Sequence, residues 1–333
     1  MREQCGIDCN FFLPEVYYRS SPMKSLISLL ALGTLLGSPV MLQAKITRVV
    51  EKSFAVQPGG TLKVQTSGGN INILTGAGNE VKVAASELIN ASSDEKADEI
   101  VQDLLLTMDQ NGDGITAVAK YRRRGGWLWG SDPVTVSFTV TVPARYNVDL
   151  NTSGGDIKVA SIDGRAKLRT SGGNLKLERI DGEVDGGTSG GNITLREGTA
   201  KVRLSTSGGN IHVERAGGEA DLSTSGGNIV IESVRSRLSA TTSGGSVKAT
   251  IEGELKGDCT LSTSGGSVVA TVDKGAAFDL RAHTSGGDVD AEGITIAIEH
   301  GGLRKSSLSG KVNGGGPVLS LGSSGGDIRL RTK

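Results

Sequence analysis

The residues that could do acid–base chemistry in this 333-residue chain are carboxylates at one position of a recurring motif. Asp156, Asp288 and Asp327 each follow a Ser-Gly-Gly triplet, whereas Asn or Ser fills that position in the copies between the first two. Sugar cleavage needs a carboxylate pair, or a carboxylate and a base, on one face. Because Asp156 and Asp288 stand seven copies apart, the pattern favours a non-catalytic protein. A β-helical carbohydrate-active enzyme, a polysaccharide lyase or hydrolase, is the alternative.

Metal ligands are equally sparse. The histidines are His212, His283 and His300, and the copies that flank His212 carry Thr194 and Val230 at its position. A structural or catalytic zinc site needs three or four ligands close together. We therefore expect no metal and no other cofactor.

One segment resembles a calcium loop. Asp109–Gly114 matches the opening of an EF-hand, but Lys120 stands where that loop needs a bidentate Glu. The residues on both sides have the composition of strands. The segment therefore predicts a tight hairpin turn.

A candidate for surface recognition is the stretch that holds both tryptophans of the chain beside three arginines. Its residues are Arg122, Arg123, Arg124, Trp127 and Trp129. Trp and Arg are enriched at binding hot spots, and the glycines in the stretch let it bend, so it is a possible binding loop. Alternatively, the tryptophans fold back and cap the end of a hydrophobic core. The sequence leaves both interpretations open.

The elements that position these residues come from a repeat. The motif Thr-Ser-Gly-Gly begins at Thr66, Thr152, Thr170, Thr188, Thr206, Thr224, Thr242, Thr263 and Thr284, with Ser-Ser-Gly-Gly at Ser323. From Thr152 the step is 18 residues five times, then 21 twice, then 39. A period near 20 predicts a stacked array of coils. We expect the longest step to hold one degenerate coil around Ser309 to Val312.

Apolar and polar residues alternate on both sides of the glycines, which predicts two short strands per repeat. The inward positions include Leu150, Leu168, Leu204, Val159, Leu177, Ile193, Ile211 and Ile229. The corner glycines between the strands are Gly154, Gly155, Gly172, Gly173, Gly190, Gly191, Gly208, Gly209, Gly226 and Gly227. We expect these corners to need positive φ angles, where a β-carbon would clash.

The repeat fits either a meander of hairpins or a coil whose strands stack in parallel. Identical residues at equal positions favour the coil, because stacking places like on like. The threonines would form one ladder, and Asn174, Asn192, Asn210 and Asn228 another, with each side chain bonded to its copy. We predict an all-β, right-handed parallel β-solenoid with about 18 to 21 residues per coil.

Alternating charges support this register. Eight residues after the motif threonine the chain reads Glu178, Arg196, Glu214, and nine after it reads Arg179, Glu197, Arg215. Neighbouring strands favour opposite charges in such columns. We expect the columns to control register, since exposed ion pairs add little stability.

The chain before the regular repeats is more varied. Residues 45–145 carry one motif copy and a predicted short helix after Ser93, followed by strands from Leu104 to Asp109, Ile115 to Tyr121 and Val134 to Pro143. These segments predict a β-rich N-terminal part with a helix and a β-hairpin excursion. Residues 146–333 form the regular solenoid.

The first 44 residues predict export. Residues 23–44 contain Lys24, an apolar run and a Leu-Gln-Ala cleavage site, which together are typical of a secretory signal peptide. Residues 1–22 add nothing to that signal, so we expect translation to start at Met23 and the mature chain at Lys45. Only Cys259 then remains, at an inward position, and we expect no disulfide. No membrane span is expected after cleavage.

The net charge limits the partners. Thirty-six basic residues balance thirty-six acidic ones, so no overall field attracts nucleic acid or an anionic membrane. The glycine content is high, but the regular return of Ile, Val and Leu argues against a disordered chain.

The segment Val134–Pro143, followed by Val148–Ile157, resembles the bacterial putative-adhesin family of domains of unknown function. That family shows a Val-x-Val-Pro strand that leads into Ser-Gly-Gly-x-Ile units. The resemblance covers roughly residues 50–333 and implies a single-stranded β-helix on the cell envelope, without catalytic residues. From it we expect an adhesin-like binding or scaffold role in the periplasm or at the cell surface, with an envelope protein or a glycan as partner.

Overall fold

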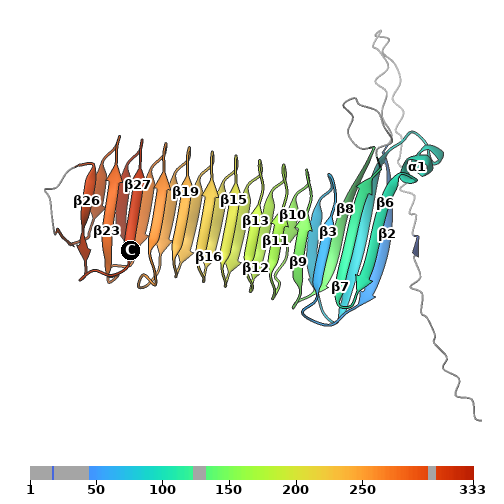
Figure 1. Ribbon diagram of the computed structural model, residues 1–333, viewed down its shortest axis with the longest axis horizontal. Coiled ribbons are helices and arrows are strands. Elements are labelled where there is room, and N and C mark those ends of the chain that lie inside the picture. The colour runs from blue at the N-terminus through green and yellow to red at the C-terminus, as the bar shows by residue number, and fades with distance from the viewer. Residues whose placement is uncertain (1–16, 19–44, 123–132, 299–304) are drawn as a thin grey trace, which may run out of the picture.

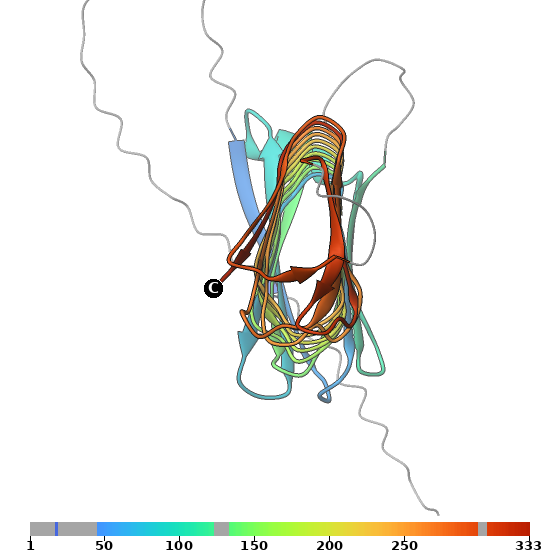
Figure 2. The ribbon, with the colours of Figure 1, turned by 90° about the vertical axis from the view of Figure 1, so that its left-hand side faces the viewer.

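The structure is a computed structural model that describes residues 17–18, 45–122, 133–298 and 305–333. Two long sheets, here called sheet A and sheet B, face each other along one axis, and the chain winds from one to the other (Figure 1). Seen from the C-terminal end, the coils superimpose as a narrow, flattened ring (Figure 2). The predicted all-β solenoid is confirmed.

Each regular coil gives one strand to each sheet. In sheet A these strands are β4 (Ile71–Gly76), β10 (Ile157–Val159), β12 (Leu175–Ile180), β14 (Ile193–Gly198), β16 (Ile211–Ala216), β18 (Ile229–Val234), β20 (Val247–Ile251) and β22 (Val268–Val272). Those of sheet B are β3 (Thr61–Gln65), β9 (Asn147–Asn151), β11 (Ala166–Arg169), β13 (Val184–Gly187), β15 (Val202–Thr206), β17 (Ala220–Thr224), β19 (Leu238–Thr242) and β21 (Cys259–Thr263). Neighbours pair in parallel at the repeat spacing, as Ile193 does with Ile211.

The inward residues predicted from the alternation are buried. Leu150, Leu168, Ile193, Ile211 and Ile229 are all fully enclosed between the sheets. One cluster of buried side chains runs from Phe54 to Leu330, so the N-terminal part and the regular coils share a core. Burial of these aliphatic columns is the main stabilising term of the fold.

The corner glycines are required for a reason other than the expected one. Positive φ angles occur at seven glycines of the described chain, and none belongs to a Thr-Ser-Gly-Gly motif. The second glycine of each motif is instead pressed against the backbone of a neighbouring coil. A β-carbon on Gly191 would lie 1.9 Å from the carbonyl oxygen of Gly173, whereas one on Gly190 would make only ordinary contacts at 3.7 Å or more. Close stacking of coils, rather than turn geometry, excludes a side chain there.

The two polar ladders also differ from each other. The Thr170 hydroxyl does not bond to another threonine: it donates to the carbonyl of Gly155, 2.9 Å away, and accepts the N–H of Gly173. The asparagine ladder is confirmed, because the Asn210 amide donates to Asn192 Oδ1 at 3.2 Å. That oxygen also accepts the Asn210 backbone N–H at 2.8 Å. Both ladders therefore pair backbone groups that the tight corner would leave unsatisfied.

The N-terminal end contains longer, mostly antiparallel strands. They are β2 (Lys45–Ala55), β5 (Glu80–Asn90), β6 (Leu104–Asn111), β7 (Gly114–Tyr121) and β8 (Val134–Pro143). The two-residue strand β1 (Tyr17–Tyr18) pairs with β2. In space the coil of β3 and β4 lies between the coil of β7 and β8 and that of β9 and β10. The first motif copy is thus enclosed by two later segments of the chain.

The predicted helix and hairpin are both present. Helix α1 (Asp94–Val101) is capped by Ser93, whose hydroxyl accepts the Lys96 N–H at 3.4 Å. Strands β6 and β7 pair around a two-residue turn in which Gly112 has a φ angle of 58°, as the first residue of a type II′ turn requires. The EF-hand-like segment is therefore a hairpin turn.

The C-terminal end departs from the expected stacking order. Its strands are β23 (Phe278–Thr284), β24 (Val289–Glu292), β25 (Ile296–Ala297), β26 (Ser307–Val312), β27 (Val318–Ser323) and β28 (Ile328–Thr332). The last coil of the sequence, β27 with β28, lies between the coil of β21 and β22 and that of β23 and β24 (Figure 1). The expected degenerate coil around Ser309 to Val312 was wrong: β26 is an antiparallel strand on β23.

Candidate binding surface

The Arg/Trp stretch falls largely outside the described residues. Arg122 is exposed just after β7, and its N–H donates to the Asp103 carbonyl at 2.8 Å. Arg123, Arg124, Trp127 and Trp129 lie in residues 123–132, which the structure does not describe. The choice between a binding loop and a cap therefore stays a prediction.

The two charged columns predicted on sheet A are confirmed. Arg196 lies 3.6 Å from Glu178 and 3.9 Å from Glu214, while Glu197 lies 3.6 Å from Arg179 and 3.3 Å from Arg215. Glu232, which repeats the charge of Glu214, pairs instead with His212 at 3.2 Å. The charges of these two columns are mutually satisfied and offer little to a partner.

Sheet B carries further charged columns that the sequence reasoning missed. Lys167 lies 3.8 Å from Asp149, and Arg203 lies 3.7 Å from Asp221. At the neighbouring corner, Arg165 pairs with Glu183 at 2.9 Å and Lys201 with Glu219 at 3.1 Å. The same signal, sign alternation at the repeat spacing, identifies these columns in the sequence.

Beyond the charged columns, the outer face of sheet B is covered by hydroxyl groups. We call this the hydroxyl face; it consists of Ser205, Ser223, Ser239, Thr241, Thr260, Ser262 and Ser320. These side chains point away from the core on strands that lie side by side in register. Strands in a sheet are about 4.8 Å apart, so the hydroxyls form two regular rows.

The hydroxyl face ends in a shallow depression of about 370 Å³ near β23. Gly322 on β27 is paired with Ser262 on one side and His283 on the other. Because glycine has no side chain, the row is interrupted there. Arg281 and several serines line the rest of the depression.

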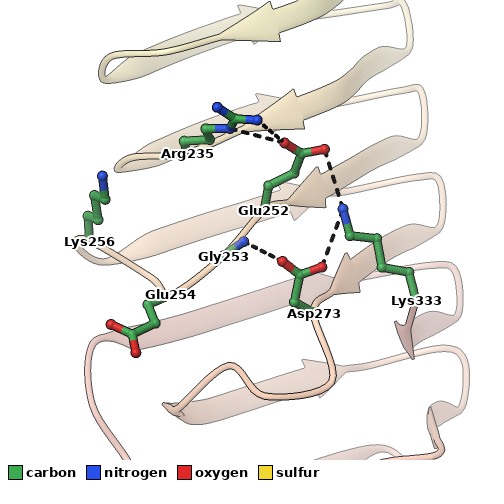
Figure 3. A pocket seen from close by; sticks show the side chains of 7 residues that line it. All are labelled: Arg235, Glu252, Gly253, Glu254, Lys256, Asp273 and Lys333. Atoms are coloured by element: carbon green, nitrogen blue, oxygen red, sulfur yellow. Dashed lines mark hydrogen bonds and ion pairs between the residues drawn. The ribbon is translucent and has the colours of Figure 1, made fainter.

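A second depression, of about 350 Å³, holds a closed network of charges (Figure 3). Lys333 Nζ lies 3.3 Å from carboxylate oxygens of both Glu252 and Asp273, and Arg235 lies 3.1 Å from Glu252. Hydrogen bonds from Ser233 and Arg235 lower the pKa of Glu252, and those to Asp273 and Glu252 raise the pKa of Lys333. The network links Lys333 to the neighbouring coils, and the charges of Lys333, Arg235, Glu252 and Asp273 are paired within it.

The aspartates weighed as catalytic candidates are placed differently from the expected order. Asp327 and Asp288 are direct neighbours, with the Asp288 N–H 3.2 Å from Asp327 Oδ1, because the last coil of the chain is inserted between earlier ones. Asp156 lies at the other end of the regular coils. Asp327 also pairs with Arg329 at 2.9 Å. The contact of the Asp288 N–H with Asp327 repeats the backbone-to-side-chain bond of the asparagine ladder.

Few other groups are available for chemistry. Over the described residues, no three His, Cys, Asp or Glu side chains come close enough to hold a metal ion. His300 lies outside those residues. The Cys259 thiol is fully buried, and that burial raises its pKa. In the same part of the chain no helix is long and apolar enough to cross a membrane.

Comparisons with known proteins give a family and several similar folds. The family model described as Toastrack DUF4097 matches residues 62–331. No curated protein matches the chain. A solved structure described as a "putative cell adhesion protein" of Clostridium sporogenes ATCC 15579 is 11% identical, with 85% of this chain and 99% of that chain covered and a TM-score of 0.19.

Two more solved structures are described as a "putative adhesin". The one from Bacteroides fragilis NCTC 9343 is 15% identical, with 86% of this chain and 97% of that chain covered and a TM-score of 0.30. The one from Parabacteroides merdae ATCC 43184 is 10% identical, with 86% and 96% covered and a TM-score of 0.32.

Proposed function

This chain belongs to the Toastrack DUF4097 family, and from that premise we propose that it is a non-catalytic, exported protein of the cell envelope or surface. In this proposal it binds a partner through its repetitive solenoid face. Solenoids present extended surfaces on which many weak contacts add up. The signal-peptide pattern of residues 23–44 supports export, with residues 45–145 and 146–333 as the two parts of the mature chain.

The observation that carries the binding role is the hydroxyl face. Its serines and threonines both donate and accept hydrogen bonds. Ser239, Thr260 and Ser320 continue the column of Arg203 and Asp221 beyond its last charge. A long polymer with regularly spaced hydroxyl groups complements such rows. We therefore favour an envelope or surface polysaccharide as the partner, with an envelope protein as the alternative outcome of the test.

Paired substitutions on opposite faces test this assignment. Thr241→Arg with Thr260→Arg changes the hydroxyl face, and Thr250→Arg with Thr271→Arg makes the same change on the outer face of sheet A. Binding of the labelled mature chain to intact cells and to purified surface polysaccharide is measured for both. The first pair should weaken binding about tenfold, and the second should bind like the wild type. If both pairs bind like the wild type, the hydroxyl face is not the binding surface.

Export is tested separately. Cell fractionation with an antibody should place the protein in the periplasm or outside the cell, and mass spectrometry should find Lys45 as its first residue. Peptides that contain Cys5 or Cys9 in the mature protein contradict this processing. A release assay for reducing sugars on plant and bacterial polysaccharides tests the alternative, a β-helical carbohydrate-active enzyme.

The Arg/Trp stretch is part of the proposal as a possible second contact. Trp127→Ala combined with Trp129→Ala distinguishes the two interpretations. Loss of cell binding at an unchanged thermal midpoint supports a binding loop. A midpoint that falls by many degrees, with binding lost only in proportion to unfolding, supports a cap.

A further inference from the structure

The depression at the end of the hydroxyl face lies where a side chain is missing from a row of hydroxyl groups. Gly322 takes the place that a serine or threonine occupies on the preceding strands β15, β17, β19 and β21. The gap opens a notch of about 370 Å³, near the lower end of the roughly 300–1,000 Å³ typical of small-ligand sites. We call it the Gly322 notch.

Its lining is rich in hydrogen-bond donors. Arg281 on β23 stands between Ser309 on one neighbouring strand and Ser320 on the other. His283, two residues along the same strand, also lines the notch, as does Ser262. None of the residues that line it is Asp or Glu. An uncharged or anionic group therefore meets donors on several sides and no opposing carboxylate.

Arg281 differs from the arginines of the charged columns. Those of the charged columns, such as Arg203 and Arg196, each face a carboxylate on a neighbouring coil. Arg281 is exposed and forms no ion pair within the described chain. The nearest acidic residue on its own strand face, Asp279, accepts the Gly316 N–H at 3.4 Å. The positive charge of Arg281 is thus left for a ligand.

We propose that the Gly322 notch binds a phosphate or sulfate group. The Arg281 guanidinium supplies charge-assisted hydrogen bonds to two oxygens, and the hydroxyls of Ser262, Ser309 and Ser320 together with the His283 ring donate to the others. The charged depression of Figure 3 differs because carboxylates line it: Lys333 holds Glu252 and Asp273, and Arg235 holds Glu252. This inference does not rest on the proposed function.

Calorimetry on the purified protein tests the site with inorganic phosphate and inorganic sulfate as probes. We expect dissociation constants of about 1 mM, as suits a shallow site. Arg281→Gln should weaken binding at least about tenfold. Gly322→Val, which fills the notch at a position where a β-carbon meets only the Ser262 hydroxyl at 3.6 Å, should weaken it similarly. Arg203→Gln, an arginine of a charged column on the same sheet, is the matched control and should bind like the wild type.

A polymer distinguishes the two sources of the oxyanion. Dextran sulfate is compared with uncharged dextran on the same variants. Tighter binding of dextran sulfate than of free sulfate, lost in Arg281→Gln, assigns the site to a polymer-borne group. If inorganic phosphate binds, dextran sulfate does not, and Arg281→Gln abolishes the phosphate binding, the site is assigned to a free anion. The proposal is overturned if neither the free anions nor dextran sulfate bind, or if Arg281→Gln binds them as the wild type does. Because Arg281 is exposed, we expect Arg281→Gln to leave the thermal midpoint unchanged. That measurement confirms that the variant is folded.

Discussion

Gly173 stacks so closely on Gly155 of the preceding coil that a β-carbon on Gly173 would lie 1.9 Å from the Gly155 carbonyl oxygen. No rotation of a side chain relieves a contact with backbone. Gly173→Ala should therefore force the two coils apart and lower the free energy of unfolding by about 3 kcal/mol or more.

Gly172→Ala is the matched control for this prediction. Its β-carbon would meet the preceding coil at 3.7 Å, which is an ordinary contact. Urea unfolding of both variants measures the difference. Equal losses of stability in the two variants contradict the stacking explanation. They indicate instead that the backbone conformation of the corner requires both glycines.

The sequence predicted the position of these glycines but not the reason for them. A Gly-Gly pair at a bend is compatible with positive φ angles and with close approach of another backbone, and only coordinates distinguish the two. The threonine ladder has the same limit. Equal spacing predicts that Thr152 and Thr170 lie in one column, but it does not reveal that each hydroxyl bonds to a glycine carbonyl.

The aliphatic columns were predictable because period-two alternation fixes which face is buried. Ile211 is fully enclosed, whereas Lys176 on the same sheet is exposed. Ile211→Asp places an unpaired carboxylate among apolar side chains and should cost several kcal/mol. Lys176→Asp should change the unfolding free energy by about 0.5 kcal/mol or less. Chemical denaturation of both variants checks the pair, and comparable losses argue against the assigned faces.

The Cys259 thiol should be unreactive in the native protein. It occupies the column between Leu238 and Leu319, has no exposed surface, and its pKa is raised by burial. The thiolate is the reactive form, so a polar thiol reagent should label Cys259 only at the rate of unfolding. Rapid labelling under native conditions is the contrary result.

The order of the coils could not be derived from the sequence. Every motif copy is a suitable neighbour for every other, because the same residues recur at the same positions. Chain order was the natural assumption, yet Leu319 lies between Cys259 and Leu280. The connections that allow this insertion fall in the less regular segments after Thr263, where the repeat gives no information.

The inserted coil makes the C-terminal end depend on residues 318–333. Without them, β21 keeps only β19 as a partner and β23 keeps only β26. Cys259 then loses its neighbour Leu319 and is covered on one side only. A chain that ends at residue 317 should label rapidly at Cys259 and should be cleaved by proteases between residues 278 and 312. The coils before β21 should stay resistant. Lys333→Ala, which removes only exposed ion pairs, is the control and should leave Cys259 protected.

The last prediction concerns Glu87, the one buried carboxylate among the residues that the structure describes. It is 3% exposed on β5, at an inward position between Ala85 and Ile89, and its register partner on β2 is Arg48. Burial raises the pKa of Glu87, and the nearby charge of Arg48 only partly offsets this. A carboxyl with a pKa higher in the folded state than in the unfolded state binds its proton more tightly when folded.

The pH dependence follows from that difference. Below the ordinary pKa of 4.5 the Glu87 carboxyl is protonated in both the folded and the unfolded state, so its ionisation does not lower the stability of the fold. As the pH rises through the pKa of the folded state, ionisation stabilises the unfolded state more than the folded state, so the free energy of unfolding falls. Glu87→Gln, which cannot ionise, should therefore raise the thermal midpoint at pH 7.5 relative to the wild type, with a smaller gain or none at pH 4. Glu51→Gln, an exposed carboxyl on β2, is the control at both pH values. If the gain from Glu87→Gln is equal at both, or larger at pH 4, then the ionised form of Glu87 is not the source of the cost.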